Sequence, residues 1–577
     1  MSRRGNSVHV VTTERRYKDR VYRTHLLRRS YREGKRVRKE TVGNLSHLPE
    51  HVVDLIRRSL KGETFTATGD FENTRSWNHG HVRAVLDAMH QLDFENLIGT
   101  RSSRQRDLVV GMVAARILDP DSKLATARSW STTTLPGELT IEDATEDDLY
   151  EAMDWLLERQ EGIEKKLAGR HLDEDGLALY DLTSSYFEGK TCSLAKRGYN
   201  RDKKSGKLQV NYGLLTDGRG CPIAVSVYEG NTGDPTTLLP QARKLKDSLG
   251  VKCLALVGDR GMITQKAIDA LKNIEDMRWI GALKSGKIRE LVEQKNIQPS
   301  LFDERNLFEI THPDYPGERL IACRNPALAK ERTLTRVSLI EATSKLLQEV
   351  QRIVSSGKLR GKADIGVRIG RVINKHKVAK HFKLRILDNG FFYKLKDDII
   401  AAEAALDGIY VIRTNVRSTV LNTEDTVRSY KQLSNVERAF RSLKTVDLKV
   451  RPIFHHLENR VRAHIFLCML AYYVEWHMRE AWRELTFADE DQEAKKTRDP
   501  VTPAKRSADA LQKVQSRKLS DQTDTHSFGT LLTHLSTIVR NQCQRKGATS
   551  YEEFFFMTTT PSAKQQRALD LIQGIAL

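Results

Sequence analysis

Between residues 177 and 283, short apolar runs alternate with stretches of helical periodicity, and this alternation constrains the fold more than any other feature of the chain. Apolar runs as short as these are typical of buried strands. They predict strands over 177–183, 208–216, 222–228, 253–258 and 278–283, and helices over 236–248 and 264–273. Three strands followed by strands and helices in alternation predict an α/β fold.

Two of the predicted strands carry or precede an aspartate. Asp181 lies inside the run 177–183, and Asp259 directly follows the run 253–258. A carboxylate in or just past a buried strand is costly unless it is paired, hydrogen-bonded or metal-bound. The ends of central strands are also where α/β folds place their sites. Asp181 and Asp259 are therefore candidate site residues.

The segment 430–444 predicts a helix with one carboxylate between an aromatic hydroxyl and a lysine. Tyr430, Glu437 and Lys444 are spaced seven apart, so they line up along one face. The apolar stripe that would seat this helix on a core is Val436, Phe440 and Leu443. An ordinary amphipathic helix with a solvated charged face is the alternative. Together, Asp181, Asp259 and Glu437 offer hard oxygen donors that suit Mg²⁺ or Mn²⁺ better than zinc.

In these residues the chain resembles the DDE transposases of bacterial insertion sequences, in the group marked by Tyr-x2-Arg-x3-Glu-x6-Lys around the catalytic glutamate. Tyr430, Glu437 and Lys444 match that spacing, whereas Leu433 stands in the arginine position. Arg438 or Arg441 could compensate for the missing cation. The resemblance covers roughly residues 80 to 480, and the long gap before Glu437 suits members with a large insertion.

The resemblance implies a ribonuclease H-like catalytic core that cleaves DNA and joins its strands with two Mg²⁺ or Mn²⁺ ions per active site. It implies that Asp181 bridges the ions while Asp259 and Glu437 each complete one. It also implies DNA contacts for several residues near the cut, listed here: Tyr430, Arg438, Arg441 and Lys444. For stacking a base flipped out at the transposon end the candidate is Trp279, with a buried core tryptophan as the alternative.

Charge favours a nucleic-acid partner. The chain of 577 residues has 95 Lys and Arg against 75 Asp and Glu, a net charge of +20. Residues 1–45 hold 14 of these cations and only 4 acids, and residues 358–383 hold nine cations with Asp364 as the one acid. Clustered positive charge is the footprint of phosphate contacts. We expect double-stranded DNA as the partner, both transposon ends and target, bound by at least a homodimer because two ends must be processed.

The expected organisation adds a β-rich basic module and a helical domain before the core. Val8 to Thr13, Tyr22 to Leu27 and Val37 to Val42 predict strands, with a turn at Glu33-Gly34. The expected domains are 1–47 (basic β-rich DNA-binding module), 48–170 (helical DNA-binding domain), 171–283 (first part of the core), 284–405 (basic insertion of mixed strand and helix), 406–485 (second part of the core with the Glu437 helix), 486–526 (flexible linker) and 527–577 (C-terminal helical tail).

Other features narrow the class of protein. The six cysteines show no CxxC pairing, which predicts free thiols in a reducing cytoplasm. As a DNA-binding protein, the chain is expected to be associated with the nucleoid. The most apolar segment, 463–476, is too short for a membrane span and predicts a core helix. Glu188 and Asp202 are interpreted as loop residues. Two alternative functions are an inactive or domesticated transposase that only binds DNA, and another ribonuclease H-like nuclease.

Overall fold

A computed structural model of the chain describes residues 7–18, 20–65, 69, 71–173, 176–202, 204, 206–251, 254–546 and 554–576. It divides into two compact units, which are considered separately. The first unit comprises Met1–Ser76 and Arg540–Thr558, and the second comprises Trp77–Val539 and Thr559–Leu577. Each unit therefore combines N-terminal and C-terminal parts of the chain.

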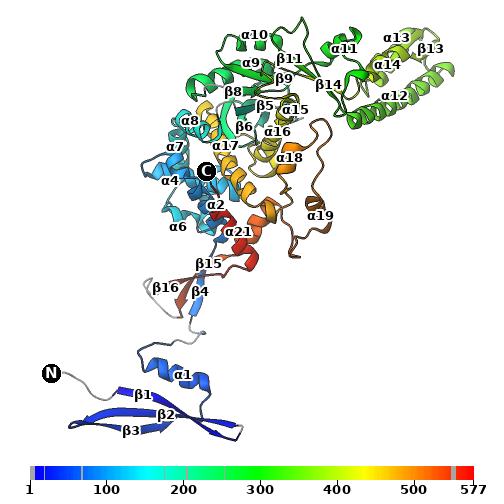
Figure 1. Cartoon of the computed structure of the whole chain (residues 1–577). Coiled ribbons are helices and arrows are strands. Elements are labelled where there is room, and N and C mark those ends of the chain that lie inside the picture. Colours follow the sequence, from blue (N-terminus) through cyan, green and yellow to red (C-terminus); the bar gives the residue numbers. More distant parts are fainter. Residues whose placement is uncertain are drawn as a thin grey trace. The chain divides into compact units, whose positions relative to one another are not determined.

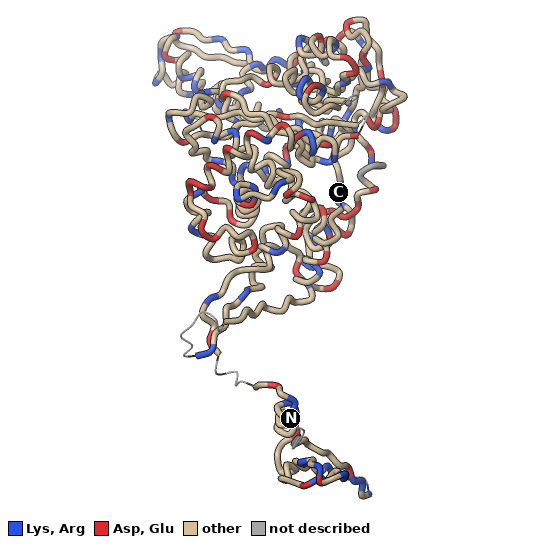
Figure 2. Tube along the Cα trace, turned by 90° about the vertical axis from the view of Figure 1, so that its left-hand side faces the viewer, with Lys and Arg blue, Asp and Glu red and all other residues tan. Residues whose placement is uncertain are grey.

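The first unit contains the expected basic β-sheet. Its antiparallel strands are β1 (Ser7–Tyr17), β2 (Arg20–Glu33) and β3 (Arg36–Asn44), followed by helix α1 (Glu50–Ser59). Gly34 has a φ of 62°, which allows the tight β2–β3 turn that Glu33-Gly34 predicts. Lys and Arg recur along these strands (Figure 2). Three of the acids pair with arginines, in Arg23–Glu14, Arg29–Glu40 and Arg38–Glu33, so the cations remain in excess.

A second sheet in this unit was not expected from the sequence. Its strand order is β16 (Phe554–Thr558), β15 (Val539–Arg545) and β4 (Phe71–Asn78). The Asn73 amide donates to Asn541 Oδ1 across 2.9 Å. The C-terminal tail, expected to be helical, thus supplies two strands that pair beside a strand from the N-terminal part.

The second unit begins with the helices of the domain expected over 48–170, although the first part of that range, with α1 and most of β4, belongs to the first unit. The helices in the second unit are α2 (Gly80–Gln91), α3 (Phe94–Ile98), α4 (Arg104–Leu118), α5 (Lys123–Ser129), α6 (Leu135–Leu139), α7 (Glu146–Leu157) and α8 (Gln160–His171). Thr145 and Asp148 form the capping box that starts α7, with both reciprocal hydrogen bonds present. The buried faces of these helices share one continuous core with the sheet that follows.

An eight-stranded mixed sheet forms the centre of this unit, so the fold is mixed α/β (Figure 1). Its order is β10 (Leu307–Ile310), β11 (Arg319–Arg324), β14 (Ile409–Thr414), β9 (Met277–Ala282), β8 (Leu254–Val257), β5 (Gly176–Phe187), β6 (Leu208–Asp217) and β7 (Pro222–Glu229). β5, β8 and β9 run parallel, and the other neighbours are antiparallel. All five strands expected between 177 and 283 are present, and Cys253, where one was expected to begin, lies outside the described residues.

Helices flank the sheet, and two of them lie close to the expected ranges 236–248 and 264–273. The flanking helices are α9 (Asp234–Arg243) with a π-helical turn (Lys244–Ser248), α10 (Gln265–Leu271), α11 (Ser285–Glu293), α15 (Thr423–Lys431), α16 (Leu433–Arg441) with a second π-helical turn (Ser442–Val446), and α17 (Glu458–Ala481). α17 packs against α4, α7 and β7, and it is buried along most of its length, which confirms the expected core helix. None of the helices in the described ranges is long and apolar enough to cross a membrane.

The expected insertion divides into two parts. β10 and β11 extend the central sheet beyond β14, so the sheet crosses the boundary placed at residue 284. α12 (Pro326–Ser355), α13 (Lys362–Ile373), the hairpin of β12 (Phe382–Leu387) and β13 (Gly390–Leu395), and α14 (Asp397–Ala404) form a separate group (Figure 1). α12, α13 and the hairpin share a small hydrophobic core of their own, which includes Leu347, Ile365 and Phe391.

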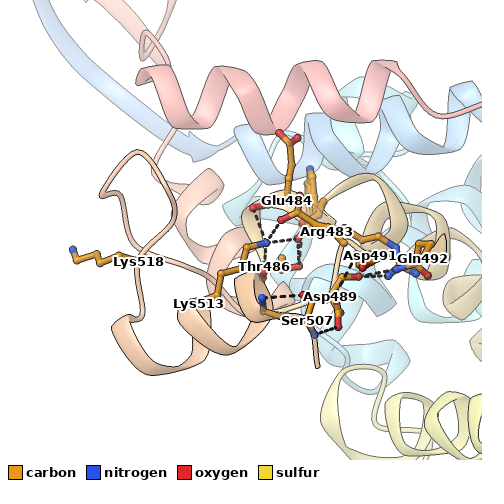
Figure 3. A network of polar contacts seen from close by, with 12 residues as sticks. Arg483, Glu484, Thr486, Asp489, Asp491, Gln492, Ser507, Lys513 and Lys518 are labelled. Atoms are coloured by element: carbon orange, nitrogen blue, oxygen red, sulfur yellow. Dashed lines mark hydrogen bonds and ion pairs between the residues drawn. The ribbon is translucent and has the colours of Figure 1, made fainter. Parts of the chain in front are cut away.

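The segment 486–526 differs from the flexible linker expected there. It contains α18 (Glu493–Thr497) and α19 (Ala508–Ser516), and Val501 is completely buried. Lys513 Nζ donates to the carbonyls of Arg483, Glu484 and Thr486 just after α17, and Ser507 Oγ donates to Asp489 Oδ1 over 2.8 Å (Figure 3). A polar composition predicted a free chain, but these polar groups are satisfied within the fold. Helices α20 (Phe528–Ser536) and α21 (Ala563–Gln573) follow it.

Candidate active site

The strand register places Asp181 and Asp259 side by side. β5 and β8 are parallel neighbours, and Leu179 pairs with Val257. Two residues further along, Asp181 is still within β5 and Asp259 follows the end of β8, so both aspartates lie at the same end of these neighbouring strands. Asp181 is half-buried within β5, and Asp259 is exposed in the turn after β8.

The third carboxylate comes from α16, which packs against β5. Val436, Ala439 and Phe440 form its buried face, and Glu437 is exposed. The single helix expected over 430–444 is interrupted at Gln432 and changes to a π-helical turn at Ser442. Tyr430, Glu437 and Lys444 therefore belong to three consecutive helical segments, although they remain close in the chain.

The pKa of Asp181 is affected by both of the other carboxylates. Burial, with smaller contributions from the negative charges of Asp259 and Glu437, raises the pKa of Asp181 to about 7, while the Leu182 N–H and Arg201 favour the charged form and oppose this shift. The Leu182 N–H donates to Asp181 Oδ1 over 2.8 Å. Within the described ranges, no group of three carboxylates has oxygens all within 4.8 Å of one another, so this trio is spread more widely than ligands around one ion.

Tyr430 lies directly beside the trio. Its hydroxyl donates to Asp259 Oδ1 over 3.4 Å, a long hydrogen bond. Burial, followed by the charge of Asp259, raises the pKa of Tyr430, so the hydroxyl keeps its proton and can serve as a donor. The phenol is thus placed to orient the carboxylate of Asp259.

Lys444 is buried rather than open to a phosphate. Its ammonium donates to Thr183 Oγ1 over 2.9 Å and pairs with Asp202 Oδ1 over 2.8 Å. Burial lowers the pKa of Lys444, and Asp202 opposes this shift. Asp202, interpreted from the sequence as a loop residue, is 1% exposed, pairs also with Arg451, and accepts from the Tyr186 N–H over 3.0 Å. In this structure Lys444 thus takes part in an ion pair next to the strand that carries Asp181, and its contact with DNA stays a prediction.

The other residues expected to contact DNA differ in their exposure to solvent. Arg438 and Arg441 are exposed on α16. Leu433, in the arginine position of the family motif, packs against the hydrophobic core. Trp279 on β9 is completely buried beneath Arg413, whose guanidinium lies 5.3 Å from the ring centre, so no base can stack on it in this conformation.

Sequence reasoning did not identify Arg201, whose charge reaches Asp181. Its guanidinium pairs with Asp234, and its backbone N–H donates to Ser184 Oγ over 3.2 Å. The only sequence signal is the run of basic residues between β5 and β6, which looks like an ordinary solvated loop. This loop lies next to the site because Asp202 anchors it to Lys444 and Arg451.

Two family models match the chain. The model of the transposase DDE domain matches residues 174–474, and the model of the N-terminal domain of IS1634 family transposases matches residues 10–72. A solved structure, the piggyBac transposase synaptic complex with hairpin DNA, is 10% identical over 78% of this chain and 79% of that one, with a TM-score of 0.35. No curated protein matches the chain.

Proposed function

Because the chain belongs to the family of transposases with a DDE domain and carries the N-terminal domain of IS1634 insertion-sequence transposases, we propose that Asp181, Asp259 and Glu437 are its catalytic carboxylates. The protein is an insertion-sequence transposase, an enzyme of DNA transposition that binds DNA. The assignment is supported best by the position of Asp181 and Asp259 at the same end of two neighbouring parallel strands, where the charges of Asp259 and Glu437 both act on Asp181. In the five strands β7-β6-β5-β8-β9, an antiparallel trio is followed by two strands parallel to β5, which supports a ribonuclease H-like core.

The donor set fits the divalent metals that this family uses. Carboxylate oxygens are the preferred ligands of Mg²⁺ and Mn²⁺. Asp181 has a raised pKa because burial and two like charges disfavour its ionised form, and a divalent cation would relieve that repulsion. We propose that Asp181, Asp259 and Glu437 together would hold two such ions. When bound, such ions activate the attacking oxygen and neutralise charge on the scissile phosphate.

The protein's own side chains complete the site. Tyr430 donates to Asp259 and so fixes the orientation of that carboxylate. Arg438 and Arg441 are exposed on the helix that carries Glu437, so they can bind phosphates beside the cut. The positive charge of Arg201 favours the ionised form of Asp181. We propose that Arg201 supplies the positive charge that is missing at Leu433. The basic sheet β1–β3 would bind the DNA ends, in a homodimer assembled on DNA in the nucleoid.

Cleavage of labelled duplexes from the DNA that flanks the gene tests this assignment. With Mg²⁺ or Mn²⁺, the wild type should cut at a flanking repeat, and Asp259→Asn should lower the rate by more than about 100-fold, beyond the usual effect of a residue that only supports a ligand. Binding of the ends should persist. Asp269→Asn is the matched control because Asp269 is an exposed aspartate on the neighbouring helix α10.

Two results would change the conclusion. Cutting by Asp259→Asn at the wild-type rate would remove Asp259 from the catalytic trio. Binding of the ends by the folded wild type without cutting in either metal would instead identify a transposase that has become a DNA-binding protein.

A further inference from the structure

Two histidines and a cysteine that are far apart in the sequence lie close together in the fold, outside the carboxylate site. His171 ends α8, Cys221 lies in the turn between β6 and β7, and His477 is on α17. Their potential ligand atoms all lie within 4.8 Å of one another. We propose that His171, Cys221 and His477 bind a zinc ion that fastens the helical region to the central sheet.

The distance between Cys221 and His477 is close to that between two ligands of a tetrahedral zinc ion. Cys221 Sγ lies 3.8 Å from His477 Nε2. Zinc bonds of about 2.3 Å to sulfur and 2.0–2.1 Å to nitrogen give a separation between two ligand atoms of roughly 3.5 Å. Movements of a few tenths of an ångström would therefore bring the sulfur and the imidazole to the distances of a bound ion.

The type of ligand selects zinc over the ions expected at the carboxylates. A thiolate and two imidazoles are borderline or soft donors, which suit Zn²⁺, whereas Mg²⁺ requires oxygen. Binding would release the thiol proton of Cys221 to solvent. Three protein ligands leave a fourth position for water or for another group. The proposed site is thus chemically distinct from the site at Asp181.

The surroundings hold these ligands in place. Asp217 Oδ1 accepts from the Cys221 N–H over 2.8 Å and from the Arg219 N–H over 2.9 Å, which fixes the turn. The positive charge of Arg219 is offset because its Nε pairs with Asp217 Oδ2 over 3.0 Å. His171 Nε2 lies 3.1 Å from the Tyr473 hydroxyl. Such outer contacts are what orient imidazole and thiolate ligands around a metal.

Ordinary core packing is the competing explanation. His477 and Tyr473 have ring centres 4.8 Å apart, and a thiol can form a weak hydrogen bond with an imidazole. The same helix provides an internal comparison, because Cys468 Sγ lies 4.0 Å from His464 Nε2. The two pairs are alike in burial and chemistry, but among the described residues only Cys221 has a second histidine within reach. Cys468 therefore serves as the matched control.

Metal content and spectroscopy of the full-length protein test the proposal. The wild type, purified without chelator, should contain about one zinc per chain. After exchange with Co²⁺ it should show a thiolate-to-cobalt charge-transfer band, and zinc but not Mg²⁺ should raise its Tm. Cys221→Ser and His477→Gln should lose the band and the zinc-dependent shift in Tm, whereas Cys468→Ser should retain both.

Two outcomes would overturn the proposal. One is a wild type without stoichiometric zinc whose Tm does not respond to added zinc and which shows no cobalt band. The other is a Cys221→Ser variant that keeps the band. If Cys221→Ser and His477→Gln fail to fold, His171→Gln answers the same question, because His171 is only half-buried at a helix end. None of these readouts depends on DNA cleavage.

Discussion

The ion pair between Lys444 and Asp202 predicts that substitution of Asp202 destabilises the protein more than substitution of Lys444. Asp202 is shared by Lys444 and Arg451, whose side chains are 10% and 22% exposed, so Asp202→Asn leaves two partly buried cations without their counterion. Removing one partner of a buried pair costs about 3–5 kcal/mol of the free energy of unfolding. Lys444→Met leaves Asp202 with Arg451 and the Tyr186 N–H, so it should cost only the lost charge-assisted hydrogen bonds, about 1–3 kcal/mol.

Two assays separate this structural role from a contact with DNA. Thermal or urea unfolding, followed by tryptophan fluorescence, should rank Asp202→Asn as clearly less stable than Lys444→Met. Anisotropy titrations with labelled DNA ends should give the same dependence of affinity on salt for Lys444→Met and wild type. A phosphate contact at Lys444 would instead lower that logarithmic slope by about 0.9. A lowered slope with unchanged stability, or equal costs for the two substitutions, would refute the structural interpretation.

Two further predictions concern elements that hold the site. Burial and the negative charge of Asp447 raise the pKa of Glu475 to about 7, although the positive charge of Arg479 opposes this shift. Between pH 4.5 and 7 the folded state therefore binds more protons than the unfolded state, and the free energy of unfolding falls as pH rises. Glu475→Gln should therefore gain stability over wild type across that range, by at most roughly 3 kcal/mol, and a difference in urea unfolding that does not change with pH would contradict this. A Cβ at Gly213 would lie 2.1 Å from the Tyr180 hydroxyl, next to Asp181 in β5. Gly213→Ala should cost about 1–3 kcal/mol in thermal unfolding and reduce cleavage, while Gly169→Ala, with open space around it, should do neither.

The five strands between 177 and 283 were predictable because a short apolar run in the local sequence is enough to indicate a buried strand. β6 and β7 each end one residue beyond the bounds that the sequence predicts, and β9 is shifted by one residue. Asp181 and Asp259 could be identified because each is an acid in, or directly after, an apolar run, which the local sequence shows without knowledge of the neighbouring strand. Their adjacency additionally needs the register of β5 against β8, which no local pattern contains.

Interactions between distant segments could not be predicted in this way. The spacing of Tyr430, Glu437 and Lys444 is a local property, but the environment of Lys444 depends on Asp202, more than two hundred residues earlier. The helix breaks at Gln432 and Ser442 are also not visible in the apolar spacing of Val436, Phe440 and Leu443. The pairing of the C-terminal strands beside β4, and the meeting of His171 with His477, depend on the tertiary fold in the same way.

The place of the insertion in the sheet links it physically to the catalytic helix. β11 pairs with β14 over six residues, and β14 leads into α15 and then to Glu437 on α16. Arg319 on β11 donates to the carbonyls of Val416 and Leu421, over 3.0 and 2.8 Å, in the loop between β14 and α15. This contact satisfies two carbonyls of the loop that positions α15, so the first strands of the insertion support Glu437 rather than standing apart from it. The removable part of the insertion is then α12 to α14, which has its own core, because loss of β11 would also expose the edge of β14 and release this loop.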